Sequence, residues 1–182
     1  MTVIKHPNQR VAVLVDVQNL YHSAKHLFSS RVNFKALLEE AVAGRLLVRS
    51  LAYVVKAGEM DEEQAFFDAL VKAGFEVKSK DLQIFAGGMK KADWDVGLAV
   101  DAIRLSNLVD AIILITGDGD FIPLVEFLKM QKGVQVEVAA FGRSASAKLK
   151  EAADDFLDLG QNSKFLISIS NRSKRIANRN RI

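Results

Sequence analysis

Two carboxylates, Asp118 and Asp120, follow an apolar run at residues 111–115 that has the pattern of a buried strand. A second apolar run, at residues 11–15, ends in Asp16. If the two runs are neighbouring parallel strands, Asp16 and Asp118 emerge at the same edge of a sheet. Open α/β folds bind their ligands at that edge.

The acidic candidates share one kind of chemistry. Asp95 begins a helical pattern at residues 95–107 and joins Asp16, Asp118 and Asp120 as a candidate. Converging carboxylates repel one another, so their cluster is unfavourable unless a cation neutralises it. Oxygen ligands without His or Cys favour Mg²⁺ or Mn²⁺ over zinc. Because Mg²⁺ also takes phosphate oxygens as ligands, the pattern predicts phosphate chemistry.

Each acid also has a structural interpretation. Asp120 could cap the helix that follows it, and Asp95 could cap its own helix. Asp16 is harder to explain as a structural residue, because it ends a run of apolar residues. Asp93 is an alternative to Asp95 as the ligand. Asp101 is a weaker candidate, because six residues place it ~240° around the helix from Asp95.

Polar residues near the acids are candidates for positioning a substrate. Asn19 could bind a phosphate or orient Asp16, or it could cap a helix. Thr116 could donate to a carboxylate or be only a β-branched strand residue. Lys90 and Lys91 could hold a nucleic-acid backbone beside the acids, or belong to an ordinary charged loop.

Two further pairs of side chains have weaker patterns. Phe85 and Trp94 could stack on bases, but an aromatic residue near the start of a helix is more often part of the core. His22 and His26 have the spacing of metal ligands on one helix face. Without a third ligand nearby in sequence, we expect them to lie on a solvated surface.

Strands and helices alternate along the chain. The apolar runs predict strands at residues 11–16, 46–55, 75–78, 111–116 and 134–140. The helical patterns cover residues 19–29, 34–43, 61–73, 95–107, 121–131 and 145–153. The alternation predicts an α/β fold: a three-layer, mostly parallel sheet with helices on both faces. Residues 79–94 fit neither period, and residues 165–169 are a candidate closing strand.

Composition narrows the class of protein. A chain of 182 residues with 49% apolar residues predicts one globular domain. The absence of cysteine excludes disulfides and thiolate metal sites. No run of ~18 apolar residues predicts a membrane span. We therefore expect a cytoplasmic protein with no membrane partner.

Charge is unevenly distributed. Residues 161–182 contain six basic and no acidic residues, whereas the rest of the chain has 19 basic and 22 acidic residues. We expect an N-terminal extension at residues 1–9, a domain at 10–160 and a partly disordered basic tail at 161–182. The tail could contact an RNA backbone or be only a frayed terminus. Its candidate contacts are Arg172, Lys174, Arg175, Arg179 and Arg181.

Three motifs together resemble a known family. Residues 15–19 (VDVQN), 91–102 (KADWDVGLAVDA) and 116–124 (TGDGDFIPL) are similar to those of the NYN domain. This domain is the LabA-like branch of the PIN-like ribonuclease superfamily. The resemblance covers residues 10–160 and implies a PIN-like, Rossmann-like parallel sheet that performs divalent-metal-dependent RNA cleavage.

The resemblance also implies roles for individual residues. Asp16 matches the acid after the first strand, and Asn19 matches the asparagine that follows it. Asp95 matches the acid that opens the central helix. Asp118 and Asp120 match the pair after the fourth strand. All the motif acids are present, so the resemblance implies an active enzyme.

These observations predict a Mg²⁺- or Mn²⁺-dependent ribonuclease that acts on RNA, with single-stranded RNA as the expected substrate. One alternative is a non-catalytic RNA-binding or adaptor protein with the same fold. Another is a metal-dependent phosphatase of the haloacid dehalogenase type, which needs a second Asp where Gln18 stands. The cleavage polarity is open, and so is the oligomeric state, with a homo-oligomer among the alternatives.

Overall fold

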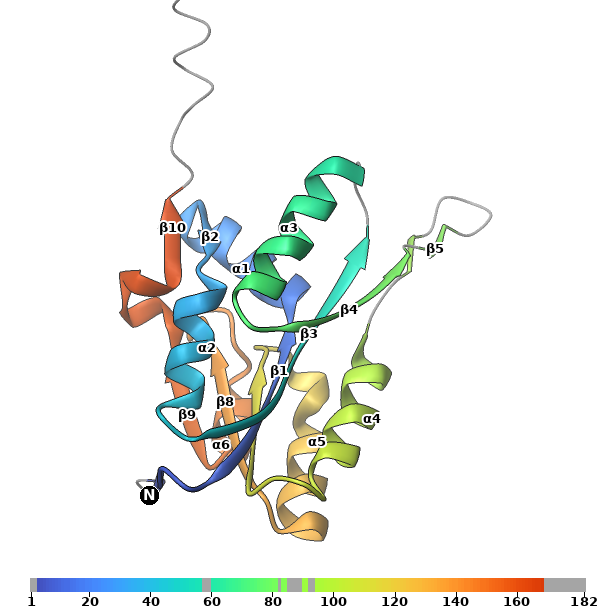
Figure 1. Cartoon of the computed structure of the whole chain (residues 1–182). Helices are drawn as coiled ribbons and strands as arrows, with labels where there is room; N and C mark the ends of the chain where they lie inside the picture. Colours follow the sequence, from blue (N-terminus) through green and yellow to red (C-terminus); the bar gives the residue numbers. More distant parts are fainter. Residues whose placement is uncertain (1–2, 57–59, 82, 85–89, 92–93, 169–182) are drawn as a thin grey trace, which may run out of the picture.

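The structure, a computed structural model, describes residues 3–56, 60–81, 83–84, 90–91 and 94–168; it leaves out the side chains of residues 60–62, 83–84 and 90–91. A six-stranded parallel sheet runs through its centre in the order β4-β3-β1-β7-β8-β9 (Figure 1). The strands are β1 (Arg10–Asp16), β3 (Leu46–Lys56), β4 (Glu76–Asp81), β7 (Ala111–Ile115), β8 (Gln135–Ala140) and β9 (Asp155–Asp158).

Helices cover both faces of this sheet. One face packs against α1 (Val17–Phe28), α2 (Phe34–Val42) and α3 (Met60–Lys72). The other face packs against α4 (Asp95–Leu105), α5 (Ile122–Phe127) and α6 (Ala147–Ala152). The predicted three-layer α/β fold is therefore confirmed. None of the helices described is long and apolar enough to cross a membrane.

The apolar composition of β1 follows from its central position. Val11, Val13 and Val15 point into the core beneath α1–α3, whereas Ala12 and Leu14 point into the core beneath α4. All five residues are fully buried. A parallel strand covered on both faces needs apolar side chains at successive positions, and this explains why the run shows no alternation. The same strand ends in Asp16, which it carries to the carboxyl edge of the sheet.

The edges of the fold differ from the sequence expectations. The predicted closing strand exists as β10 (Leu166–Ser168), but it pairs antiparallel with β2 (Ser30–Val32) outside the central sheet. The strand that closes the central sheet is β9, which the pattern did not predict. Two short 3₁₀ turns, Leu159–Gln161 and Ser163–Phe165, connect β9 to β10.

Two predicted segments are more broken than their patterns indicated. The single helix expected at residues 121–131 is a 3₁₀ turn, η1 (Gly119–Phe121), then α5, then a π-helical turn, η2 (Leu128–Lys132). The segment at 79–94 contains the end of β4 and a short antiparallel pair, β5 (Gln83–Ile84) and β6 (Lys90–Lys91).

Ion pairs join the strands of the sheet away from Asp16. Arg45, which precedes β3, donates two hydrogen bonds to the carboxylate of Glu137 on β8. Both side chains are buried, at 0% and 6% exposed. Lys5 lies 3.1 Å from the same carboxylate. Arg10 on β1 pairs with Asp110, just before β7, at 2.6 Å. The Arg10–Asp110 pair lies at the end of the sheet opposite Asp16, whereas Glu137 lies in the middle of β8, in register with Ile113.

Candidate metal centre

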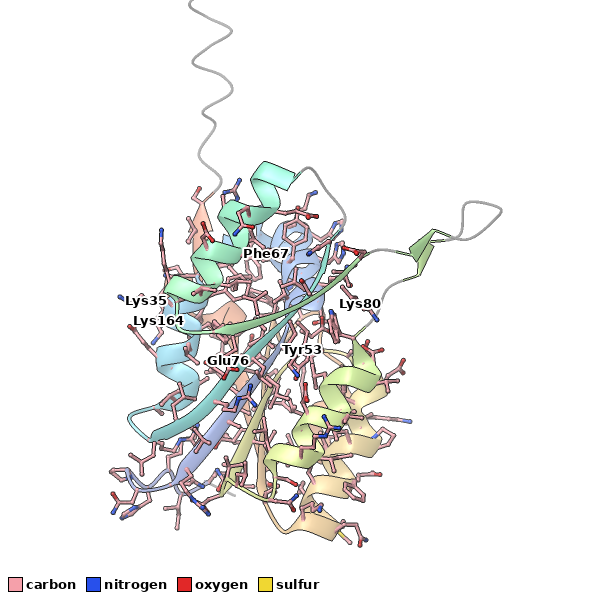
Figure 2. The ribbon with its side chains drawn as sticks, turned by 45° about the vertical axis from the view of Figure 1, so that its right-hand side comes forward. Lys35, Tyr53, Phe67, Glu76, Lys80 and Lys164 are labelled. Atoms are coloured by element: carbon pink, nitrogen blue, oxygen red, sulfur yellow. The ribbon has the colours of Figure 1, made fainter. Side chains whose placement is uncertain are left out.

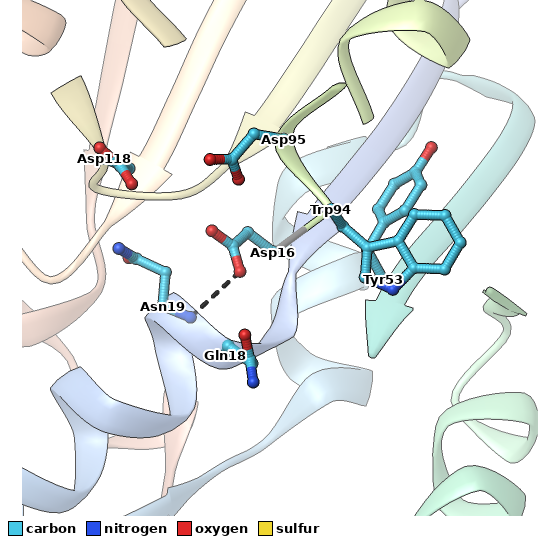
Figure 3. A pocket seen from close by; sticks show the side chains of 7 residues that line it. All are labelled: Asp16, Gln18, Asn19, Tyr53, Trp94, Asp95 and Asp118. Atoms are coloured by element: carbon cyan, nitrogen blue, oxygen red, sulfur yellow. Dashed lines mark hydrogen bonds between the residues drawn. The ribbon is translucent and has the colours of Figure 1, made fainter. Parts of the chain in front are cut away.

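Asp16 is held by two elements at once. It is the last residue of β1 and the N-cap of α1, where its Oδ1 accepts the Asn19 N–H at 3.1 Å (Figure 3). Its other oxygen accepts the Thr116 hydroxyl at 3.2 Å. Burial raises the pKa of the Asp16 carboxyl, and the nearby charge of Asp118 raises it further. This environment favours a cation beside the ionised carboxylate.

The turn after β7 is built from polar contacts. Asn19 Oδ1 accepts the Gly117 N–H at 2.9 Å, which joins α1 to this turn. The Thr116 hydroxyl accepts the Asp118 N–H at 3.2 Å. Asp118 then caps η1 by accepting the Asp120 N–H at 3.0 Å. Asn19 and Thr116 therefore position the turn, and Asp118 rather than Asp120 is the cap.

Asp95 approaches this turn from a different element. It is the first residue of α4, and Trp94 stands at the cap position without a side-chain cap. One carboxylate oxygen each from Asp95, Asp118 and Asp120 lies within 4.8 Å of the other two. Asp120 is exposed, and the other two are partly buried. The side chains of Asp95 and Asp118 face the same space as Asp16 in Figure 3.

A pocket of about 200 Å³ is lined by two of these acids, Asp95 and Asp118, but not by Asp120. Asp16, Asp95 and Asp118 line one part of it, beside Asn19. Three further residues line it that the sequence patterns did not assign to the site: Gln18, Tyr53 and Trp94. Tyr53 could have been found from strand order, because it is the β3 residue in register with Asp16.

Asp101 lies away from the acids, as the helical geometry predicted. Its carboxylate accepts the Tyr53 hydroxyl at 2.8 Å and the Lys78 ammonium at 2.5 Å. The carboxylate of Asp101 and burial together raise the pKa of Tyr53, with burial the larger cause. Asp101 therefore anchors α4 to β3 and β4.

Several candidates fall outside the site or outside the described residues. His22 and His26 are exposed on α1, with ring centroids 6.3 Å apart. Lys90 and Lys91 form β6, but their side chains are not described. The residues that lie outside the described part of the chain are Phe85, Asp93, Arg172, Lys174, Arg175, Arg179 and Arg181.

The acids suit a hard divalent cation. The cluster of Asp95, Asp118 and Asp120 offers only carboxylate oxygens, from the start of α4 and the turn after β7. Asp16, at the end of β1, is not one of these three, but it lines the same pocket as Asp95 and Asp118. Mg²⁺ and Mn²⁺ prefer such oxygens, and Mg²⁺ keeps part of its water shell when it binds few carboxylates. The exposed side of Asp120 leaves room for water and for a phosphate.

Known proteins resemble this chain along most of its length. This chain is 27% identical over 168 residues to the low amplitude and bright protein LabA of Synechococcus elongatus. The aligned region covers 86% of this chain and 87% of the relative. A crystal structure of a protein of unknown function from Vibrio parahaemolyticus matches with a TM-score of 0.81 at 32% identity. That match covers 91% of this chain and 100% of the other.

The three-layer sheet of this chain is thus shared with a solved relative. A model of the NYN domain matches residues 10–160. Since this match spans most of the sequence and both relatives extend over nearly the whole chain, the protein belongs to the NYN domain family.

Proposed function

We propose that this protein is a divalent-metal-dependent ribonuclease that hydrolyses phosphodiester bonds of RNA. The observation that carries the proposal is the convergence of three carboxylates, Asp95, Asp118 and Asp120, within 4.8 Å. Asp16 lines the same pocket as two of them. The NYN domain, with its PIN-like nuclease-type fold, supports the same reaction class.

The four acids would hold one or two Mg²⁺ or Mn²⁺ ions in this proposal. A bound ion of this kind lowers the pKa of water and neutralises charge that develops on a leaving oxygen. The chain's own contribution is to preorganise the carboxylates. Thr116 does so directly, because its hydroxyl contacts both the Asp16 carboxylate and the Asp118 N–H.

The substrate backbone would be held by basic residues of this chain. We assign Lys90 and Lys91 to this role, together with the basic residues at 172–181, because Lys and Arg contacts to phosphates are sequence-independent. Asn19 already uses its carbonyl oxygen on Gly117. Its amide nitrogen remains a donor that could bind a phosphate oxygen.

The experiment compares wild type with Asp118→Asn and Asp95→Asn on end-labelled single-stranded RNA with Mg²⁺ or Mn²⁺. Asp68→Asn is the matched control, because Asp68 is an exposed acid on α3 that does not line the pocket. We expect cleavage in wild type and in the control, loss of at least about 100-fold in the two site variants, and none in EDTA.

Three outcomes would overturn the proposal. Cleavage that persists unchanged in EDTA would exclude metal dependence. RNA binding without scission at saturating Mn²⁺ would identify a non-catalytic RNA-binding protein. Turnover of a generic phosphomonoester with RNA left intact would identify a phosphatase.

A further inference from the structure

The pocket has two chemically different walls. Asp16, Asp95 and Asp118 form one wall. Trp94 forms the other, an aromatic wall, and the ring of Tyr53, which is only 1% exposed, packs against it. Figure 3 shows the two rings together on one side of Asp16, with Asp118 on the opposite side and the Asp95 carboxylate facing that of Asp16. Holding a cation needs only the acidic wall, so the aromatic wall calls for a separate explanation.

The Trp94 ring is fixed in place by its neighbours. Its Nε1 donates to the Val54 carbonyl at 2.9 Å. Its centroid lies 5.5 Å from that of Tyr53, and the two planes meet at 60°. A Cβ at Gly97 would lie 2.6 Å from the indole, so only glycine fits there. A ring already held in one orientation loses little entropy when a ligand stacks on it.

A cation also lies at the indole. The Lys80 ammonium is 5.2 Å from the Trp94 ring centroid, and Figure 2 shows Lys80 on β4 beside the start of α4. Lys80 is partly exposed, so its flexible stem can move as a ligand enters. A cation at this position attracts the phosphate of an incoming nucleotide.

Gln18 adds a polar group to the same pocket. It lines the pocket from the first turn of α1, and its side-chain amide makes no hydrogen bond within the described part of the chain. An amide offers two donors and an acceptor. Such a group in a pocket that also has a fixed aromatic surface matches the hydrogen-bonding edge of a heteroaromatic ring.

We propose that Trp94, supported by the buried ring of Tyr53, and Gln18 form a subsite for one unpaired nucleobase of RNA. This subsite rests on the proposed ribonuclease function: the base stacks on Trp94 while its phosphate lies at the acidic wall. A pocket of about 200 Å³ is smaller than the ~300–1,000 Å³ of sites for drug-sized ligands, so it takes one such unit. A base inside a duplex cannot reach this wall, which selects single-stranded RNA.

The first test uses the fluorescence of Trp94, the one tryptophan of the sequence. Adenosine 5′-monophosphate and ribose 5-phosphate differ only by the base, and neither contains a phosphodiester bond. With Mg²⁺ present, we expect saturable quenching by the nucleotide and none by the sugar phosphate at the same concentration. Equal quenching by both compounds, or none by the nucleotide at millimolar concentration, would overturn the subsite.

Variants of Gln18 and of a control aromatic sharpen this test. Gln18→Ala should weaken nucleotide binding. Phe127→Ala should leave it unchanged, because Phe127 is an exposed aromatic on α5 that does not line the pocket. Equal affinities of Gln18→Ala and wild type for both adenosine and uridine monophosphates would remove Gln18 from the subsite.

The second test measures cleavage. Trp94→Ala should raise KM for single-stranded RNA by about 5- to 150-fold, the range for loss of one stacked base, and Trp94→Phe should restore most of this loss. Thermal unfolding of both variants checks that they fold. Cleavage of RNA with an abasic residue at the cut position, at an unchanged KM, would overturn the subsite but keep the ribonuclease. Base-dependent quenching without any cleavage would keep the subsite and overturn the ribonuclease.

Discussion

Two roles meet in the single side chain of Asp16. As the N-cap of α1 it needs only an oxygen that accepts the Asn19 N–H, which asparagine also offers. In its proposed role as a metal ligand it must be ionised although it is largely buried, and burial raises its pKa. A raised carboxyl pKa means that stability falls as pH rises from the ordinary 3.8 through the folded-state value. The ionised side chain therefore costs stability at neutral pH when no cation is bound.

Asp16→Asn should make the metal-free protein more stable at neutral pH. We expect Tm in EDTA to rise by about 2–4 °C, which is roughly 1 kcal/mol for a chain of this size. The gain should shrink as pH falls toward 3.8. In Mn²⁺ the variant should lose the metal-induced rise in Tm that wild type shows. The measurement is thermal unfolding with and without metal.

Asp120→Asn is the control for this prediction, because Asp120 is exposed and its charge costs little without metal. Its Tm in EDTA should equal that of wild type, while its shift in Mn²⁺ decreases. A lower Tm for Asp16→Asn in EDTA would mean that the carboxylate is stabilising by itself.

Gly97→Ala should be harmful, although alanine is the better helix former. In an exposed helix interior the change from glycine to alanine raises the free energy of unfolding by about 1 kcal/mol. In α4 the new Cβ would lie 2.6 Å from the Trp94 ring. We expect a net loss of about 1–3 kcal/mol from overpacking, together with a changed Trp94 emission spectrum. Urea unfolding measures the first effect, and an increase in stability would contradict the proposed packing.

Sequence reasoning located the acids but not the aromatic wall. Asp16 and Asp118 were predictable because each ends an apolar run, and parallel strands bring such ends to one edge. Tyr53 lies in the middle of an apolar run, where an aromatic residue is typical of a core. No sequence pattern around Gln18 predicts that its side chain lines the pocket. Only strand register and helix direction bring these two side chains to the pocket.

Strands could be predicted where their own residues carry a pattern, but not where they depend on pairing with distant parts of the chain. β1, β3, β7 and β8 were predictable because covered strands must be apolar. β9 was missed because it is a four-residue edge strand with an acid at each end. The partner of β10 was not predictable, because β2 lies more than 130 residues away in sequence. Long-range pairing of three-residue strands leaves almost no local pattern.

At the level of the elements, the Arg10–Asp110 pair should make stability depend on pH. Arg10 donates hydrogen bonds to Asp110 from its backbone and side chain, which lower the pKa of Asp110 from 3.8 to about 2. A lowered carboxyl pKa gives stability that is present above 3.8 and is lost as pH falls toward 2. We expect Asp110→Asn to lower Tm at pH 7.

The same comparison at acidic pH provides the control. The difference in Tm between wild type and Asp110→Asn should shrink as pH falls through the window from 3.8 to about 2. A difference that stays constant over this window would assign the loss to geometry rather than to charge.

At the scale of the whole molecule, the buried Arg45–Glu137 pair connects α2, β3 and β8. Glu137→Gln leaves the Arg45 guanidinium buried with a neutral partner. Removing one charge from a buried pair costs about 3–5 kcal/mol. We expect a drop of this size in the free energy of unfolding by urea. Cleavage per folded molecule should be unchanged, because neither Arg45 nor Glu137 lines the pocket that holds the acids. A loss of cleavage per folded molecule would mean that the Arg45–Glu137 pair also affects the geometry of the acids.

The basic C-terminal segment should affect RNA binding through charge alone. A chain ending at residue 168 loses Arg172, Lys174, Arg175, Arg179 and Arg181. Each lost phosphate contact lowers the slope of log K against log salt by roughly 0.7 on single strands. Fluorescence anisotropy of labelled RNA over a salt series measures the slope. An unchanged slope would mean that the segment does not contact RNA phosphates. The division into a domain at 10–160 and a tail at 161–182 remains a prediction.

The parallel sheet separates the ion pairs that join its strands from the carboxylates that are proposed to bind a metal. The Arg10–Asp110 pair joins strands at the amino edge and the Arg45–Glu137 pair reaches the middle of the sheet, whereas the carboxylates gather at the carboxyl edge. Asparagine in place of each of those carboxylates would keep the cap oxygens at positions 16 and 118, and we expect such a variant to fold. A descendant of this chain could therefore shed its chemistry and survive as a scaffold, recognisable by shape although silent in every enzymatic assay.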